Sequence, residues 1–264
     1  MNTSISSYYQ PPGSQANSST GEYYAEELSA LPYWPLAKCM ANSIPFPLAV
    51  AIAGVIRLRG LANWPLQPSY AKGPPGSART VDAGQVPRKT AKSWAPLMEQ
   101  LTALGFRPLI YAMTDVIGAY ESASTILLDT SGTTLVVLEW IRMPGAKGVD
   151  EQTPFEFQSV SKADPQISTV IVKKEFIVLA DALIPDYMLA KVIGDQMPVA
   201  EAYRLHQERI RLESPLAMTP ESALKEHRER SRRFFDCMLQ RKIIRKLTPA
   251  EIAAVRMKRI PLTA

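Results

Sequence analysis

Hydrophobic and polar positions are most regular between residues 124 and 142, where they predict two strands joined by a turn. Ile126 to Leu128 is an apolar run, and the next four residues, DTSG, have the composition of a turn. Gly132 supplies the turn position that tolerates positive φ. The following strand, Thr133 to Arg142, is apolar on both alternating faces, so we expect it at the centre of a sheet that is covered on both sides. One face carries Leu135, Val137 and Ile141, and the other carries Val136, Leu138 and Trp140.

The segments on either side of this hairpin extend the pattern into an α+β fold. A helical stripe that begins at Trp94 predicts a helix over 93–104, with Gly105 in the position that follows a helix. Further strands are predicted at 106–112, at 155–160 and, as one or two strands, within 167–179. Together they predict an antiparallel β-sheet of about four to six strands. We expect the first helix and helices within 198–246 to cover it.

After the last predicted strand the apolar spacing becomes helical. Pro198 opens a helix through Glu213, and Pro220 opens the longest helix, which reaches about Lys246. The TPAE sequence at 248–251 is a capping box and predicts a last short helix. We therefore expect a C-terminal helical extension beside the α+β domain.

Near the N-terminus, Cys39 to Ile56 is an apolar stretch of eighteen residues without a charge. This length lies at the lower end of what a membrane span needs. Trp34 and Trp64 flank the stretch, as aromatic residues do at a membrane interface, whereas Pro45 and Pro47 interrupt its first half. We interpret the stretch as a candidate single membrane span or membrane-seated helix. The alternative is a helix that packs in the core of a soluble protein.

Basic residues around this stretch predict its orientation. Residues 57–92 carry seven Lys or Arg and one acid, whereas residues 1–38 carry one basic residue. The positive-inside rule then places the C-terminal domain in the cytoplasm, with the protein at a membrane. Cys39 and Cys237 lie far apart and lack CxxC spacing, which agrees with a reducing compartment. A soluble cytoplasmic protein is the alternative location.

Composition divides the chain into five parts. The first residues are polar and poor in aliphatic side chains, which is typical of disorder, and a later segment is rich in Pro and Gly and lacks periodicity. The predicted parts are a disordered tail at 1–35, an apolar helix and candidate single membrane span at 36–60, a Pro/Gly-rich linker at 61–92, an α+β domain at 93–213 and a basic helical extension at 214–264.

Charge adds a predicted surface at the C-terminus. The chain has a net charge of +5, yet residues 220–264 alone carry twelve Lys or Arg against five Asp or Glu. A basic helix attracts phosphate groups, either of anionic lipid or of nucleic acid. The alternative is a solvated helix with ion pairs along its surface. The residues predicted to bind an anionic surface are Arg228, Arg232, Arg233, Arg241, Lys242, Arg245 and Lys246.

Groups that could carry catalysis or bind a metal are few. His206 and His227 lie in helical sequence among charged neighbours, without a Cys, His or paired acid at ligand spacing, so we interpret them as surface or boundary residues. The sequence GQVPRKT at 84–90 departs from a phosphate-binding loop because Arg88 stands where a glycine is needed. We therefore predict no cofactor, no metal site and no catalytic residue. An enzyme site assembled from dispersed residues stays open, and its members would include Tyr111, Asp115, Glu121 and His206.

These observations favour a non-enzymatic binding or scaffolding domain that faces the cytoplasm and is held to a membrane by the segment at 39–56. Its partner would be an anionic lipid surface or another protein. One alternative is a soluble nucleic-acid-associated protein that uses the basic C-terminal helices, and another is an enzyme with a dispersed site. Nucleic-acid binding ranks lower because the sequence shows neither a helix-turn-helix nor an aromatic stacking platform.

Overall fold

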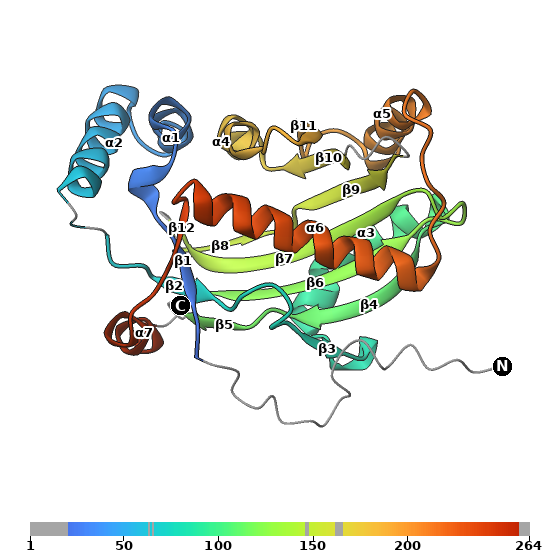
Figure 1. The fold of residues 1–264 in the computed structure, drawn as a ribbon, viewed down its shortest axis with the longest axis horizontal. Helices are drawn as coiled ribbons and strands as arrows, with labels where there is room; N and C mark the ends of the chain where they lie inside the picture. The colour runs from blue at the N-terminus through green and yellow to red at the C-terminus, as the bar shows by residue number, and fades with distance from the viewer. Residues whose placement is uncertain (1–20, 63, 65, 146–147, 162–165, 259–264) are drawn as a thin grey trace.

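The computed structural model describes residues 21–62, 64, 66–145, 148–161 and 166–258. Within these ranges the chain forms an α+β fold with seven α-helices and two β-sheets (Figure 1). The predicted fold class is therefore confirmed.

The larger sheet has eight strands among the described residues. Its strands are β3 (Arg79–Val81), β4 (Arg107–Met113), β6 (Glu121–Leu128), β7 (Leu135–Gly145), β8 (Gly148–Gln152), β9 (Phe155–Val160), β10 (Gln166–Val172) and β11 (Met188–Gly194). They are arranged in the order β11-β10-β9-β7-β6-β4-β3, and β8 pairs with the far end of β7. All pairs are antiparallel except β10 and β11, which are parallel.

The prediction of an antiparallel sheet of four to six strands was thus correct for all but one strand pair, but it gave too few strands and missed the parallel pair of β10 and β11. The difference arises after Val172. We expected strand as far as residue 179, but the chain forms a 3-10 turn η4 (Lys174–Phe176) and the helix α4 (Ile177–Leu183). Because this helix crosses between β10 and β11, the two strands run in the same direction.

A second, four-stranded antiparallel sheet joins distant parts of the chain. It contains β1 (Tyr24–Glu26), β2 (Tyr70–Lys72), β5 (Val116–Gly118) and β12 (Ile244–Lys246), in the order β12-β1-β2-β5. Residues 1–20 of the predicted tail lie outside the described residues, whereas its later part forms β1 and a 3-10 turn η2 (Leu28–Ala30). The range predicted as a linker contains β2, β3 and a 3-10 turn η3 (Ala83–Gln85).

The central hairpin, β6 and β7, is covered on both faces, as its two-sided apolar pattern predicts. On one face, Val136, Leu138 and Trp140 pack with the helices α3 (Arg88–Ala103) and α5 (Val199–Arg211). On the other face, Leu135 packs with the helix α6 (Pro220–Gln240). Figure 1 shows α6 crossing one side of the sheet and α3 behind it.

Gly132 fixes the turn of this hairpin. It adopts φ of 73°, and an added Cβ would lie 2.6 Å from the carbonyl oxygen of Met218. The carboxylate of Asp129 accepts the backbone N–H of Thr134 at 3.1 Å and the hydroxyl of Ser131 at 2.6 Å. The turn therefore needs glycine for both its backbone conformation and its close approach to the segment before α6.

The apolar stretch at 39–56 includes the end of the helix α1 (Tyr33–Met40) and most of the helix α2 (Phe46–Leu61), and these two helices pack against each other at one end of the molecule (Figure 1). Pro45 is the N-cap of α2 and Pro47 lies in its first turn, where proline is tolerated. At about 1.5 Å per residue α2 is shorter than the roughly 30 Å hydrocarbon layer of a bilayer. In the described residues no helix has the length and apolar content of a membrane span, so the predicted single span is unsupported.

The remaining helix, α7 (Pro249–Arg256), covers the four-stranded sheet. Its Val255 packs with Ala25 of β1 and Ala71 of β2. The capping box predicted at Thr248 is present, since the Thr248 hydroxyl accepts the backbone N–H of Glu251 and the Glu251 carboxylate accepts the N–H of Thr248.

Candidate functional site

Helix α2 is apolar on all sides, but only one side is buried. Ala49, Ala53 and Ile56 face the protein, where small side chains let the helix pack closely against its neighbours. Tyr33 of α1 donates its hydroxyl to the carbonyl of Val50 at 3.0 Å and ties the two helices together. The rest of the circumference of α2 carries five large apolar side chains, each between 49% and 74% exposed, which we call the α2 stripe: Phe46, Leu48, Val55, Leu58 and Leu61.

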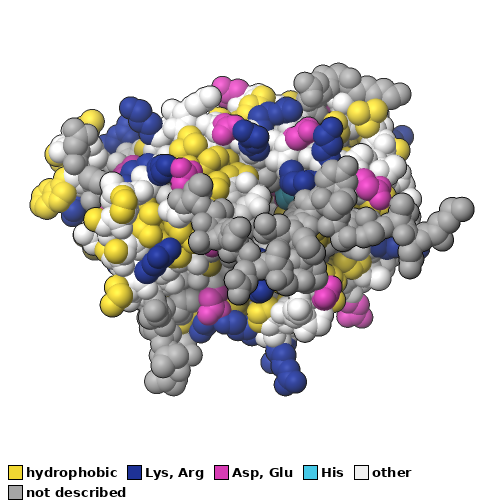
Figure 2. Space-filling view, turned by 60° about the horizontal axis from the view of Figure 1, so that its bottom comes forward, with side chains coloured by type: hydrophobic (Ala, Val, Ile, Leu, Met, Phe, Trp, Pro, Cys, Tyr) yellow, Lys and Arg dark blue, Asp and Glu magenta, His cyan; other side chains and the backbone are white. Residues whose placement is uncertain are grey.

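Exposed apolar side chains of this size normally mark a binding surface when they are contiguous. Leu48, Val55 and Leu58 follow helical spacing of seven and three residues, so they line one side of α2. Figure 2 shows hydrophobic side chains gathered toward the left end of the molecule, the end at which Figure 1 places α2, with Lys and Arg side chains among them. Leu48, Val55 and Leu58 are therefore neighbours on one exposed side of α2.

An exposed tryptophan lies near each end of the pair of helices α1 and α2, which we call the α1–α2 hairpin. Trp34, in the first turn of α1, is 57% exposed, and Trp64, just beyond α2, is 66% exposed. The Arg59 guanidinium lies over the Trp64 ring at 4.5 Å from its centroid. Indole rings favour the boundary between an apolar phase and water, and a neighbouring cation adds attraction for anions.

Acidic residues are missing from a long part of the sequence around the hairpin. Between Glu27 and Asp82 the sequence contains no Asp or Glu, whereas it contains five Lys or Arg. Three of these cations, Lys38, Arg57 and Arg59, belong to the two helices. The apolar stripe is therefore bordered by positive charge alone within its own segment.

A cavity of about 810 Å³ lies beside the C-terminal end of α2. Arg57 and Leu61 of α2 form one side, and Ser29 of η2 lies next to them. Gly60 permits this approach, because an added Cβ would lie 2.2 Å from the Ser29 hydroxyl oxygen. The end of α6 and the strand β12 form the other side, with Leu239, Lys242, Ile244, Arg245 and Lys246.

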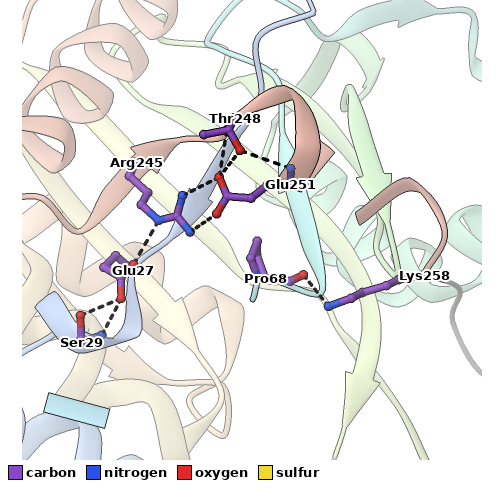
Figure 3. A network of polar contacts seen from close by, with 7 residues as sticks. All are labelled: Glu27, Ser29, Pro68, Arg245, Thr248, Glu251 and Lys258. Carbon is purple, nitrogen blue, oxygen red and sulfur yellow. Dashed lines mark hydrogen bonds and ion pairs between the residues drawn. The ribbon is translucent and has the colours of Figure 1, made fainter. Parts of the chain in front are cut away.

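Arg245 is held by two carboxylates at this cavity (Figure 3). Its guanidinium donates to Glu27 at 3.1 Å and to both oxygens of Glu251 at 2.6 and 3.1 Å. The hydrogen bond from Arg245 is the main cause that lowers the pKa of Glu251, to about 2, and the same pair raises the pKa of Arg245. Thr248 also donates to Glu251, and Ser29 donates to Glu27. This network joins the N-terminal segment to the start of α7.

Of the seven cations predicted to bind an anionic surface, some are bonded to other groups of the protein and the others are exposed. Arg241 donates to the carbonyls of Ala182 and Leu183 at 3.0 and 2.9 Å, and Arg245 is neutralised as described. Lys246 pairs with Glu22. Arg228 donates to the carbonyl of Leu224, while Arg232, Arg233 and Lys242 are exposed. Of the seven, Lys242, Arg245 and Lys246 line the cavity.

Helix α6 contains a buried arginine, Arg230, that the sequence analysis did not identify as buried. Arg230 is 3% exposed and donates to the hydroxyl of Ser168 at 3.2 Å and to the carbonyl of Ser159 at 3.0 Å. Burial lowers the pKa of Arg230, and the nearby carboxylates of Glu156 and Glu226 act in the opposite direction. Its spacing of seven residues from the buried Ala223 would have placed it on the inner side of the helix.

His206 is not a surface or boundary residue, because it lies in the core with no exposed area. Its Nε2 lies 3.0 Å from the Ser159 hydroxyl, and its Nδ1 lies 3.1 Å from the Thr169 hydroxyl. Our interpretation overlooked that His206 is spaced four residues from Ala202 and Ile210, which are also buried. Its two neighbours are hydroxyls inside the sheet, and the cavity beside α2 does not include it.

The other residues of a dispersed enzyme site do not converge. The Asp115 carboxylate accepts the Tyr23 hydroxyl at 3.1 Å, whereas Glu121 pairs with Lys89 and Arg142. The cavity beside α2 does not include Tyr111. In the described part of the chain no group of three or more His, Cys, Asp or Glu side chains is arranged to hold a metal ion.

No family model, curated protein or solved structure with which the chain was compared matches it.

Proposed function

We propose that the protein attaches to the surface of an anionic lipid bilayer through the α1–α2 hairpin and presents its α+β body there as a binding or scaffolding domain. The observation that carries the proposal is the α2 stripe, a set of exposed apolar side chains on a segment that also carries two exposed tryptophans and cations but no Asp or Glu of its own. An interfacial helix lies in the plane of the membrane and needs no span, so the proposal agrees with the length of α2.

The expected energies are large enough for reversible binding. Burying a large apolar side chain contributes roughly 1.5–3 kcal/mol when the whole side chain leaves water. The five residues of the α2 stripe are about half to three-quarters exposed, so together they contribute on the order of several kcal/mol. Each Lys or Arg near an anionic leaflet adds about 1 kcal/mol, and Lys38, Arg57 and Arg59 are candidates.

Internal pairing of the basic C-terminus supports the membrane proposal over nucleic-acid binding. Arg241, Arg245 and Lys246 already donate to groups of the protein itself, so they are less available to a phosphate backbone. The α2 stripe, by contrast, offers an apolar surface that a nucleic-acid backbone would not cover.

Co-sedimentation with lipid vesicles tests the proposal. The full chain is expected to sediment with phosphatidylglycerol-rich vesicles and to bind pure phosphatidylcholine vesicles more weakly, with a further loss as salt is raised. The double variant Val55→Asp/Leu58→Asp should bind at least about tenfold more weakly, because it places two acids at the interface. Both positions are exposed, so the variant is expected to fold, which circular dichroism checks.

Leu212→Asp is the matched control. Leu212 is 86% exposed and follows α5, outside the hairpin, so this variant should bind vesicles as the wild type does. The proposal is wrong if the wild-type chain stays in solution with anionic vesicles. It is also wrong if Leu212→Asp lowers binding as much as the double variant does. A stable dimer that Val55→Asp/Leu58→Asp dissociates, without vesicle binding, would assign the stripe to a second copy of the chain instead.

A further inference from the structure

Two of the four cations that line the cavity beside α2 remain available for an anion. Arg245 is neutralised by Glu27 and Glu251, and Lys246 is paired with Glu22. Arg57 donates one N–H to the carbonyl of Ser29 at 2.8 Å. Lys242 makes no ion pair with another residue that the structure describes. The cavity therefore holds two positive charges, Arg57 and Lys242, without a carboxylate partner.

The backbone at Lys242 is unfavourable for lysine. Lys242 has φ of 58°, in the left-handed region, and is the residue after the C-cap of α6. Its N–H bonds to the carbonyl of Leu239 at 2.9 Å, and the N–H of Ile243 bonds to that of Met238 at 2.9 Å. This is a Schellman motif, in which glycine is the usual residue at this position. A lysine with this backbone conformation is an outlier, which favours a role for its side chain.

The cavity is continuous with the proposed membrane surface. Leu61 belongs to the α2 stripe and also lines the cavity, and Arg57 precedes Leu58 of the stripe. The walls include Ala30, Leu239 and Ile244 in addition to the cations. A volume of about 810 Å³ lies within the range of small-molecule sites, about 300–1,000 Å³. The cavity thus combines two cations with apolar walls at the edge of an apolar surface.

We infer that this cavity binds the phosphate of an anionic phospholipid headgroup between Arg57 and Lys242, with the adjoining glycerol and first methylene groups against the apolar wall and Leu61. The inference rests on the proposed attachment of α2 to a bilayer and names the lipid that the attachment selects. Arg57 offers a planar fork of N–H donors and Lys242 a point charge, and both are common phosphate ligands.

Titration with short-chain lipid tests this site apart from vesicle binding. Dihexanoyl phosphatidylglycerol, kept below its micelle concentration, is added to the full chain and followed by calorimetry. Saturable binding is expected, with at least about tenfold weaker binding in Arg57→Gln and in Lys242→Gln, because each loses one charged hydrogen-bond donor. Arg232→Gln and Lys225→Gln remove the same charge from exposed positions of α6 outside the cavity and should bind as the wild type does.

Each further outcome decides a separate point. Vesicle binding without saturable binding of the short-chain lipid overturns the headgroup site and leaves the attachment of α2 intact. Equal losses in Lys242→Gln and Lys225→Gln overturn the site as well, because they show an effect of net charge alone. Inorganic phosphate that binds as tightly as the lipid overturns the lipid assignment in favour of a free-phosphate site. Saturable binding of the short-chain lipid, with no vesicle binding by the wild type, supports the site and overturns the attachment.

Discussion

The hydrogen bonds of His206 determine which of its nitrogens carries the proton. Arg209 donates to the Thr169 hydroxyl oxygen at 2.8 Å, which leaves the Thr169 hydrogen for Nδ1 of His206. The Ser159 hydroxyl donates to the carbonyl of Thr133 at 2.7 Å, so its oxygen accepts from Nε2. Nε2 therefore carries a hydrogen, and Nδ1 is left to accept from Thr169 in the neutral ring. Burial, followed by the charges of Arg209 and Arg230, lowers the pKa of His206 to about 3.

This lowered pKa predicts a loss of stability in acid. In the unfolded chain His206 has its ordinary pKa near 6.5, so below that pH the unfolded chain binds a proton that the folded chain excludes until about pH 3. His206 alone should therefore lower the free energy of unfolding by about 2 kcal/mol between pH 7 and pH 5. Urea denaturation of the wild type and of His206→Gln at both pH values measures this. Glutamine keeps an N–H donor near Ser159 and cannot titrate. The free energy of unfolding of His206→Gln should therefore fall by about 2 kcal/mol less than that of the wild type between pH 7 and pH 5. An equal decrease in both proteins would contradict the account.

At the scale of elements, the end of α6 offers a test that separates stability from binding. Lys242→Gly should raise the free energy of unfolding by up to about 1 kcal/mol, because glycine adopts the left-handed conformation at little cost. The same substitution should weaken binding of the short-chain lipid as Lys242→Gln does. Thermal or urea denaturation beside calorimetry measures both. If Lys242→Gly is less stable than the wild type, the lysine side chain stabilises the fold, and its backbone conformation gives no support to a ligand-binding role.

Helices and strands were predictable from the sequence where the spacing of apolar residues fits only one type of secondary structure. Strand β7 is apolar on both faces, and a strand of that kind is stable only between two layers. Helix α3 was predicted from its Trp94 and Leu101 stripe, although it begins earlier, after Pro87. Residues 177–179, at the start of α4, were mistaken for strand because their Ile-Val-Leu run suits both a strand and a helix, and only the crossover to β11 selects the helix.

The candidate site was harder to predict, for two physical reasons. A helix that is apolar on all sides normally indicates burial or a span, so the sequence of α2 gave no sign of one packed and one exposed side. The predicted cations were found from sequence, but their partners were not. Glu22 and Glu27 lie more than two hundred positions before Lys246 and Arg245, and only the pairing of β1 with β12 brings them together.

At the scale of the whole molecule, the four-stranded sheet positions the proposed membrane surface. Because β1 and β12 pair, the N-terminal hairpin α1–α2 lies beside the end of α6 (Figure 1). Residues of α2 and of the end of α6 line the cavity from its two sides. The apolar cluster beneath α1 and α2 includes Met238 and Ile243 from that same region. The stripe is thus held on a packed support and does not depend on a flexible linker for its orientation.

The distribution of the four tryptophans gives the most direct test of the central claim, that the hairpin enters an anionic bilayer surface. Trp34 and Trp64 are exposed at the ends of the hairpin, whereas Trp94 and Trp140 are buried in the core. Adding phosphatidylglycerol vesicles with brominated acyl chains should shift the tryptophan emission to the blue and quench part of it. The Trp34→Phe/Trp64→Phe variant should show neither change. Emission of the wild type that is unaltered by these vesicles, or quenching that persists in the double variant, would contradict the account.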